Sequence, residues 1–196
     1  MSITHIQIDP DGDTLVILGV KQDLLCLTPR NHSSRNTFYA QRKDSREADG
    51  LCHWNFGGIF DAEAFELVLK IIRGKTRGIP QDVELDLLAG IASIVDDLEC
   101  YDALSFFSQK WLLEYGWTYT LPQSVNKTLA QLILVSFAFE DAALFQSSTQ
   151  IAIRCSSDTL PTFELLVRAD ITNHVEDCKE NTGIRSADRN AACFVF

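Results

Sequence analysis

From Asp61 onward, apolar residues recur every three or four positions, and this helical spacing constrains the fold more than any other feature of the chain. Asp61 is suited to cap a helix, because its carboxylate can accept a hydrogen bond from a free backbone N–H group. The apolar face that follows consists of Ala64, Phe65, Val68, Leu69 and Ile72. We predict a helix that starts after Asp61 and stops at Gly74.

Similar spacing predicts further helices downstream. One covers about 83–98, and a second covers about 101–115 with Gly116 as its stop. Asn126 is a candidate cap for a helix through Phe137, and a short helix is expected from Asp141 to near Phe145. The last helix is predicted to open at Leu160-Pro161, since proline is tolerated in a first turn, and to bury Leu165, Leu166 and Ala169.

The N-terminal part has a different pattern. Residues 9–13 have turn chemistry, and the unbroken run of β-branched and aliphatic residues at 14–18 predicts a strand that is covered on both faces. Residues 51–56 alternate and predict a second short strand, whereas residues 28–50 are polar and are expected to be largely irregular. The predicted fold class is therefore α+β, with a small N-terminal sheet followed by short helices.

The charge balance narrows the classes of partner. Seventeen basic residues against 27 acidic ones give a net charge of −10, which repels phosphate backbones and anionic lipid. We therefore expect no direct binding of nucleic acid and no membrane association. The start of the chain does not resemble a signal peptide, so we expect an intracellular location, in the cytoplasm, the nucleus or both. Acids such as Glu84, Asp86, Asp96 and Asp97 are interpreted as solvated charges on helix faces.

No catalytic or metal motif is visible. The six cysteines lack Cys-x-x-Cys spacing and the four histidines are scattered, which favours reduced thiols over a metal or disulfide framework. Residues 9–13 have alternating acids but fail the calcium-loop pattern, because Thr14 stands where that pattern needs glycine. Cys52 and His53 are neighbours in sequence, which does not place a base on a thiol. We expect no catalytic residue, no metal and no cofactor.

An ordered set of residues from Asp61 to Leu112 resembles BTB/POZ domains, and most closely the fungal BTB-like group. The matching positions are Asp61-Ala62-Glu63-Ala64-Phe65, Ile71-Ile72, Gly74 and Pro80, then Leu85, Leu88, Ile91-Ala92, Asp96, Cys100, Ala103-Leu104 and Trp111. The opening strand 11–18 is similar to that of the family, and 137–145 is similar to a continuation found in the fungal group.

This resemblance implies a mixed sheet flanked by a cluster of helices and used for protein–protein association. It implies a BTB/POZ-like domain over 11–115, a helical extension over 116–178 and a poorly ordered tail over 179–196. Asp13 matches an acidic position that lies, in the family, near the dimer interface or a charged pocket beside it. We take Asp13, Leu15 and Ile17 as candidate protein-interaction residues. The implied function is a non-enzymatic interaction module, such as an adaptor in a ubiquitin-ligase or a transcriptional complex.

The segment 24–50 departs from the family, which has a helical hairpin there. Pro29 and the polar run after it remove the apolar spacing that such helices need. Either the domain is degenerate, or the segment reflects a shifted reading frame or a mis-spliced junction. Because the hairpin supplies most of the family's dimer contact, homodimerisation is in doubt, and we expect lower stability or an exposed apolar patch.

Three functional hypotheses follow. The first is the interaction module, whose partner is either a second copy or a different protein. The second is a small enzyme or ligand-binding domain with a site built from scattered residues. The third is a degenerate paralogue without function.

Overall fold

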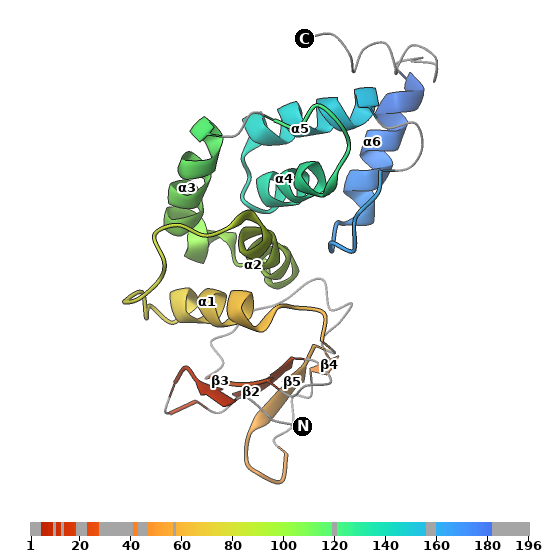
Figure 1. Cartoon of the computed structure of the whole chain (residues 1–196). Coiled ribbons are helices and arrows are strands. Elements are labelled where there is room, and N and C mark those ends of the chain that lie inside the picture. Colours follow the sequence, from red (N-terminus) through yellow and green to blue (C-terminus); the bar gives the residue numbers. More distant parts are fainter. Residues whose placement is uncertain are drawn as a thin grey trace. The chain divides into compact units, whose positions relative to one another are not determined.

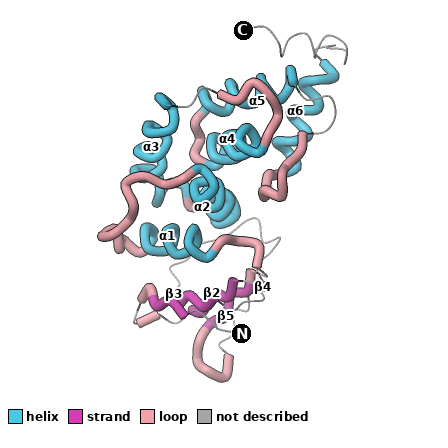
Figure 2. The backbone as a smooth tube through the Cα atoms, viewed as in Figure 1, coloured by secondary structure: helices cyan, strands magenta, loops and turns pink. Residues whose placement is uncertain are grey.

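The structure is a computed structural model, and it combines α-helices with one small mixed β-sheet (Figures 1 and 2). The predicted α+β class is therefore confirmed at this level. The structure describes residues 5–9, 11–12, 14–18, 23–27, 41–42, 47–56, 58–118, 121–155 and 160–181. By their internal contacts the residues form two compact units, 1–81 with 94–105 and 82–93 with 106–196. The expected division at 115 and 178 stays a prediction.

The sheet of the first unit has five strands in the described part of the chain. Their order is β1-β3-β2-β5-β4. The strands are β1 (His5–Gln7), β2 (Thr14–Leu18), β3 (Asp23–Leu27), β4 (Gln41–Arg42) and β5 (Cys52–Asn55). β2 pairs antiparallel with β3 and parallel with β5, while β1 lies parallel to β3 and β4 antiparallel to β5.

The predicted strands at 14–18 and 51–56 correspond to β2 and β5. β2 is buried at Thr14, Leu15, Val16 and Leu18, as expected for an apolar run that is covered on both faces. The turn predicted at 9–13, before β2, is confirmed in part, because the Gly12 N–H donates to Asp9 O at 3.1 Å. β1 and β3 were not predicted, and β4 lies within the segment expected to be largely irregular.

Helix α1 (Ala62–Ile72) has the boundaries that the sequence predicts. Asp61 Oδ1 accepts from Ala64 N at 2.9 Å. At the other end of the helix Gly74 has a φ of 69°. The Gly74 N–H donates to Ile71 O, and the Lys75 N–H donates to Lys70 O. This pair of bonds is a Schellman motif, which explains the stop at glycine.

An aromatic cluster joins α1 to the sheet. Phe65, which is fully buried on α1, lies 5.0 Å from Phe56, the residue after β5, and Phe60 lies within 5.7 Å of both rings. Offset and edge contacts at these distances are favourable beyond the area they bury. An ion pair also joins Arg73, which follows α1, to Asp9 at 2.7 Å.

Two helices run across the boundary between the units. α2 (Leu85–Leu98) and α3 (Tyr101–Thr118) are each divided by it. The prediction that α3 stops at Gly116 is wrong, because one glycine costs a helix only about 1 kcal/mol and does not always end it. The interpretation of the α2 acids as solvated charges is wrong at Asp96 and Asp97, which are half-buried.

The second unit is built around α4 (Lys127–Ala138), which is buried from Leu129 to Ser136. Asn126 caps it as predicted, with Oδ1 accepting from Leu129 N at 2.9 Å. The buried amide of Gln131 donates to Asp86 Oδ1 at 2.7 Å, which also ties α4 to the first turn of α2. A helix covered all round needs such a partner for each polar group.

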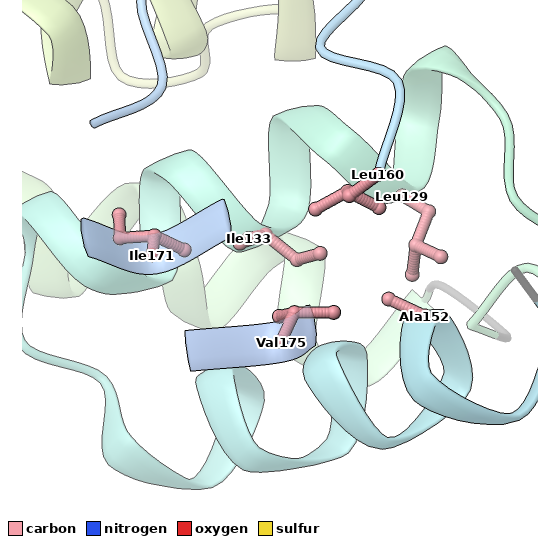
Figure 3. Close-up of a cluster of buried hydrophobic side chains, with 6 residues drawn as sticks. All are labelled: Leu129, Ile133, Ala152, Leu160, Ile171 and Val175. Carbon is pink, nitrogen blue, oxygen red and sulfur yellow. The ribbon is translucent and has the colours of Figure 1, made fainter. Parts of the chain in front are cut away.

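Helices α5 (Ala142–Cys155) and α6 (Ala169–Asn181) pack with α4. Figure 3 shows their shared apolar cluster, which consists of Leu129, Ile133, Ala152, Leu160, Ile171 and Val175. The prediction that α5 ends near Phe145 is wrong. Its Ser147 and Thr149 hydroxyls donate to carbonyls one turn earlier, at 2.9 and 2.7 Å, so these polar residues do not break the helix.

The predicted start of the last helix at Leu160-Pro161 is also wrong. α6 begins at Ala169, which is exposed rather than buried, and Leu165 and Leu166 are half-buried before the helix. The segment instead turns at 162–165, and Ile171 and Val175 provide the buried face of α6. The tail beyond residue 181 lies outside the described residues.

Candidate interaction surface

Two of the three predicted interaction residues, Leu15 and Ile17, belong to β2, the central strand of the sheet. Asp13 lies outside the described residues. Leu15 and Ile17 point to one face of β2, since they are two residues apart. Leu15 is buried at 9% exposure and Ile17 is half-buried. Both positions pair with β3 on one side and β5 on the other, so the backbone there is not a free edge. Their role in binding stays a prediction.

A separate apolar surface lies on α3 in the second unit. Phe106 is 73% exposed and Leu113 is 61% exposed. Residues seven apart lie on the same face of a helix, about 10 Å from each other along its axis. We call these two side chains the α3 apolar face.

The opposite side of α3 is packed into the protein. Trp111 and Ser108 are buried, and the Trp111 ring lies 5.7 Å from that of Phe107. Phe107 in turn makes an edge contact with Phe106 at 5.4 Å. α3 therefore has apolar residues on two faces, although one buried stripe is enough to fix a helix to a core. Phe106 and Leu113 are the exposed large apolar residues of the second face.

His53, Asp49 and Asp9 of the first unit have structural partners. His53 Nε2 lies 2.8 Å from Asp49 Oδ2, and Asp49 Oδ1 accepts from Leu51 N at 3.0 Å. These hydrogen bonds, that of Leu51 first, lower the pKa of Asp49. His53 points away from Cys52 because neighbours in a strand alternate, which confirms that this adjacent pair is not a thiol with its base. Asp9, in the acidic turn, is held by Arg73.

Three cysteines outside the sheet differ in burial and bonding. Cys100 is buried, and its removal from water raises its pKa to about 12, so this thiol is inert. Cys155 is disulfide-bonded, so the expectation of reduced thiols is wrong at that position. Cys178 Sγ lies 3.7 Å from His174 Nε2 on α6.

Sequence reasoning missed the pair His174–Cys178, because it treated the histidines as scattered. The available signal was the spacing of four residues, which brings two side chains together on a helix. That signal was weak here, because the last helix was predicted to begin at Leu160-Pro161 and not at Ala169. Among the described residues, no group of three or more His, Cys, Asp or Glu side chains is arranged to hold a metal ion.

No family model, curated protein or solved structure matches this chain. Within the described part of the chain, none of the helices combines the length and the apolar character that crossing a bilayer requires.

Proposed function

We propose that this chain is a non-enzymatic protein–protein interaction module. The observation that carries the proposal is the α3 apolar face, where Phe106 and Leu113 are 73% and 61% exposed on one side of a helix that is already anchored by Trp111. Burying two such side chains against a partner removes apolar area from water, which is the main favourable term in most protein associations.

The finer assignment is a BTB/POZ-like module of the fungal group. It is supported by the ordered residues from Asp61 to Leu112 and by a mixed sheet at the N-terminal end followed by helices. On this assignment the chain acts inside the cell as an adaptor in a ubiquitin-ligase or transcriptional complex, and it binds protein rather than nucleic acid or membrane. Its partner is a second copy or a different protein.

The test compares two matched double variants of the full chain. Phe106→Ser with Leu113→Ser removes the α3 apolar face, whereas Gln109→Ser with Gln150→Ser changes two exposed polar side chains. Because all four positions are exposed, each variant is expected to keep the unfolding free energy of the wild type to within about 1 kcal/mol.

Two measurements cover the two kinds of partner. Light scattering over a range of concentrations detects self-association, and affinity purification from cells followed by reconstitution with the purified candidate measures a heterologous Kd. We expect the Phe106/Leu113 variant to weaken the association at least about tenfold, which corresponds to 1.4 kcal/mol, and the glutamine control to retain it. Equal affinity of the two variants, or no association of the wild type with any purified protein, contradicts the proposal.

A further inference from the structure

The loop that follows α1 presents a hydroxyl group between two cations. Thr76 is exposed, and so are its neighbours Lys75 and Arg77. The Lys75 ammonium group donates to Ile8 O. Within the described part of the chain, no hydrogen bond or ion pair holds the side chains of Thr76 and Arg77. The hydroxyl oxygen of Thr76 is therefore available to a reagent from solvent.

The tip of this loop is held by little of the backbone. Its start is fixed where α1 ends, since the Lys75 N–H donates to Lys70 O at 2.8 Å. Beyond that point the Ile79 N–H donates to Thr76 O at 3.2 Å, with Gly78 at φ 89° inside the turn. Such an exposed turn can open locally while the rest of the unit stays folded. An enzyme that modifies Thr76 can therefore draw the turn into an extended conformation.

Positive charge is concentrated at this turn. Residues 67–81 contain four basic residues and no acidic one, in a chain whose net charge is −10. Two of the four, Lys70 and Arg73, form ion pairs at 2.5 and 2.7 Å. The other two, Lys75 and Arg77, have no ion pair with a described carboxylate. They flank Thr76 directly, so an acidic groove on another protein is attracted to this site.

The other described hydroxyl groups do not share this setting. Among the serine and threonine residues whose burial the structure describes, Thr76 and Ser124 are exposed and the rest are half-buried or buried. Ser124 also lies in a loop, between Gln123 and Val125, and therefore has no charged neighbour in the sequence. Ser124 is thus an internal control for exposure without the flanking cations.

We propose that Thr76 is a phosphorylation site for a protein kinase that selects basic residues on both sides of its acceptor. Thr76 Oγ1 bonds to the γ-phosphorus of ATP, and the bond from that phosphorus to the β–γ bridging oxygen breaks. The hydroxyl proton passes to a carboxylate of the kinase, and ADP leaves. Lys75 and Arg77 then lie beside the new phosphate and offset its charge.

The experiment incubates the full chain with ATP and the catalytic fragment of protein kinase C, and follows each phosphopeptide over time by mass spectrometry. We expect an initial rate at Thr76 that is at least about tenfold higher than the rate at Ser124, because the flanking cations favour the encounter with the kinase. Thr76→Ala removes the fast product. Lys75→Gln with Arg77→Gln is expected to slow phosphorylation of Thr76 at least about tenfold.

A matched variant separates the local charge from the total charge. Lys127→Gln with Arg154→Gln removes two exposed cations on other elements and is expected to leave the rate at Thr76 unchanged. Circular dichroism shows whether each variant keeps the helical content of the wild type. Equal rates at Thr76 and Ser124 overturn the proposal. An undiminished rate at Thr76 in the Lys75/Arg77 variant, or an equal loss in the Lys127/Arg154 variant, also overturns it.

Discussion

At the scale of single residues, Asp97 shows how burial changes the role of a charge. It lies near the end of α2, where the last turn has no basic residue and the helix dipole is negative. Burial first, and repulsion from Asp96 second, raise its pKa from the ordinary 3.8 to about 6. The folded state therefore favours the protonated carboxyl, and ionisation at neutral pH destabilises it.

The sign of the pH dependence follows from this shift. Between about pH 4 and pH 6 the folded protein binds more protons at Asp97 than the unfolded chain does, so its contribution to the unfolding free energy falls as pH rises. Asp97→Asn is expected to raise the unfolding free energy at pH 7.5 by on the order of 1 kcal/mol, allowing for solvent screening, and to change it little near pH 4.

Urea denaturation of wild type and Asp97→Asn across this pH range measures the effect. Asp82→Asn changes an exposed carboxylate and serves as the matched control, with an expected change below about 0.5 kcal/mol. A gain for Asp97→Asn that is the same at pH 4 and pH 7.5 would show that the carboxyl charge is not its cause.

At the scale of elements, the turn before α6 is strained. Leu165 N donates to Thr162 O at 3.0 Å, and the two residues between them, Phe163 and Glu164, have φ values of 52° and 65°. Side chains other than glycine or asparagine rarely occupy this left-handed region, at a cost of about 1–2 kcal/mol per residue. The flanks hold the turn, since Leu160 is buried in the cluster and Arg168 stacks 5.5 Å from the Phe137 ring.

Replacing a strained residue of this turn by glycine is expected to stabilise the protein. For Glu164→Gly we expect the unfolding free energy to rise by about 0.5–1 kcal/mol, because relief of strain outweighs the extra entropy of the unfolded chain. Gln146→Gly on the exposed face of α5 is expected to lower it by about 1 kcal/mol. Thermal or urea unfolding measures the change in unfolding free energy for each variant. A loss of stability in both variants would mean that the turn is not strained.

At the scale of the whole molecule, the net charge of −10 is the property with the broadest effect on partners. It opposes encounter with any polyanion, whatever the detail of the surface. For a labelled duplex DNA at 150 mM salt we expect a Kd weaker than about 10⁻⁴ M, the weak end of non-specific binding. Fluorescence anisotropy measures it, and micromolar binding that weakens steeply with salt would contradict the expectation.

Features that depend on neighbours in sequence could be predicted. Asp61 and Asn126 cap α1 and α4 because a side chain reaches a backbone N–H only three residues away. Gly74 ends α1 for a similarly local reason, and residues 14–18 form a strand because every side chain in the run is apolar or β-branched. The overall α+β class and several element boundaries follow from such local patterns.

Only the tertiary structure decided which strands pair, where α5 ends, where α6 begins, and which side chains remain exposed. β1 lies beside β3 and not β2, and β2 pairs with β5, which is more than 30 residues later in the sequence. Phe106 and Trp111 are both aromatic residues of α3, yet one is 73% exposed and the other is fully buried. Exposure is set by the elements that pack around a side chain, and these contacts are not encoded in the spacing of any one segment.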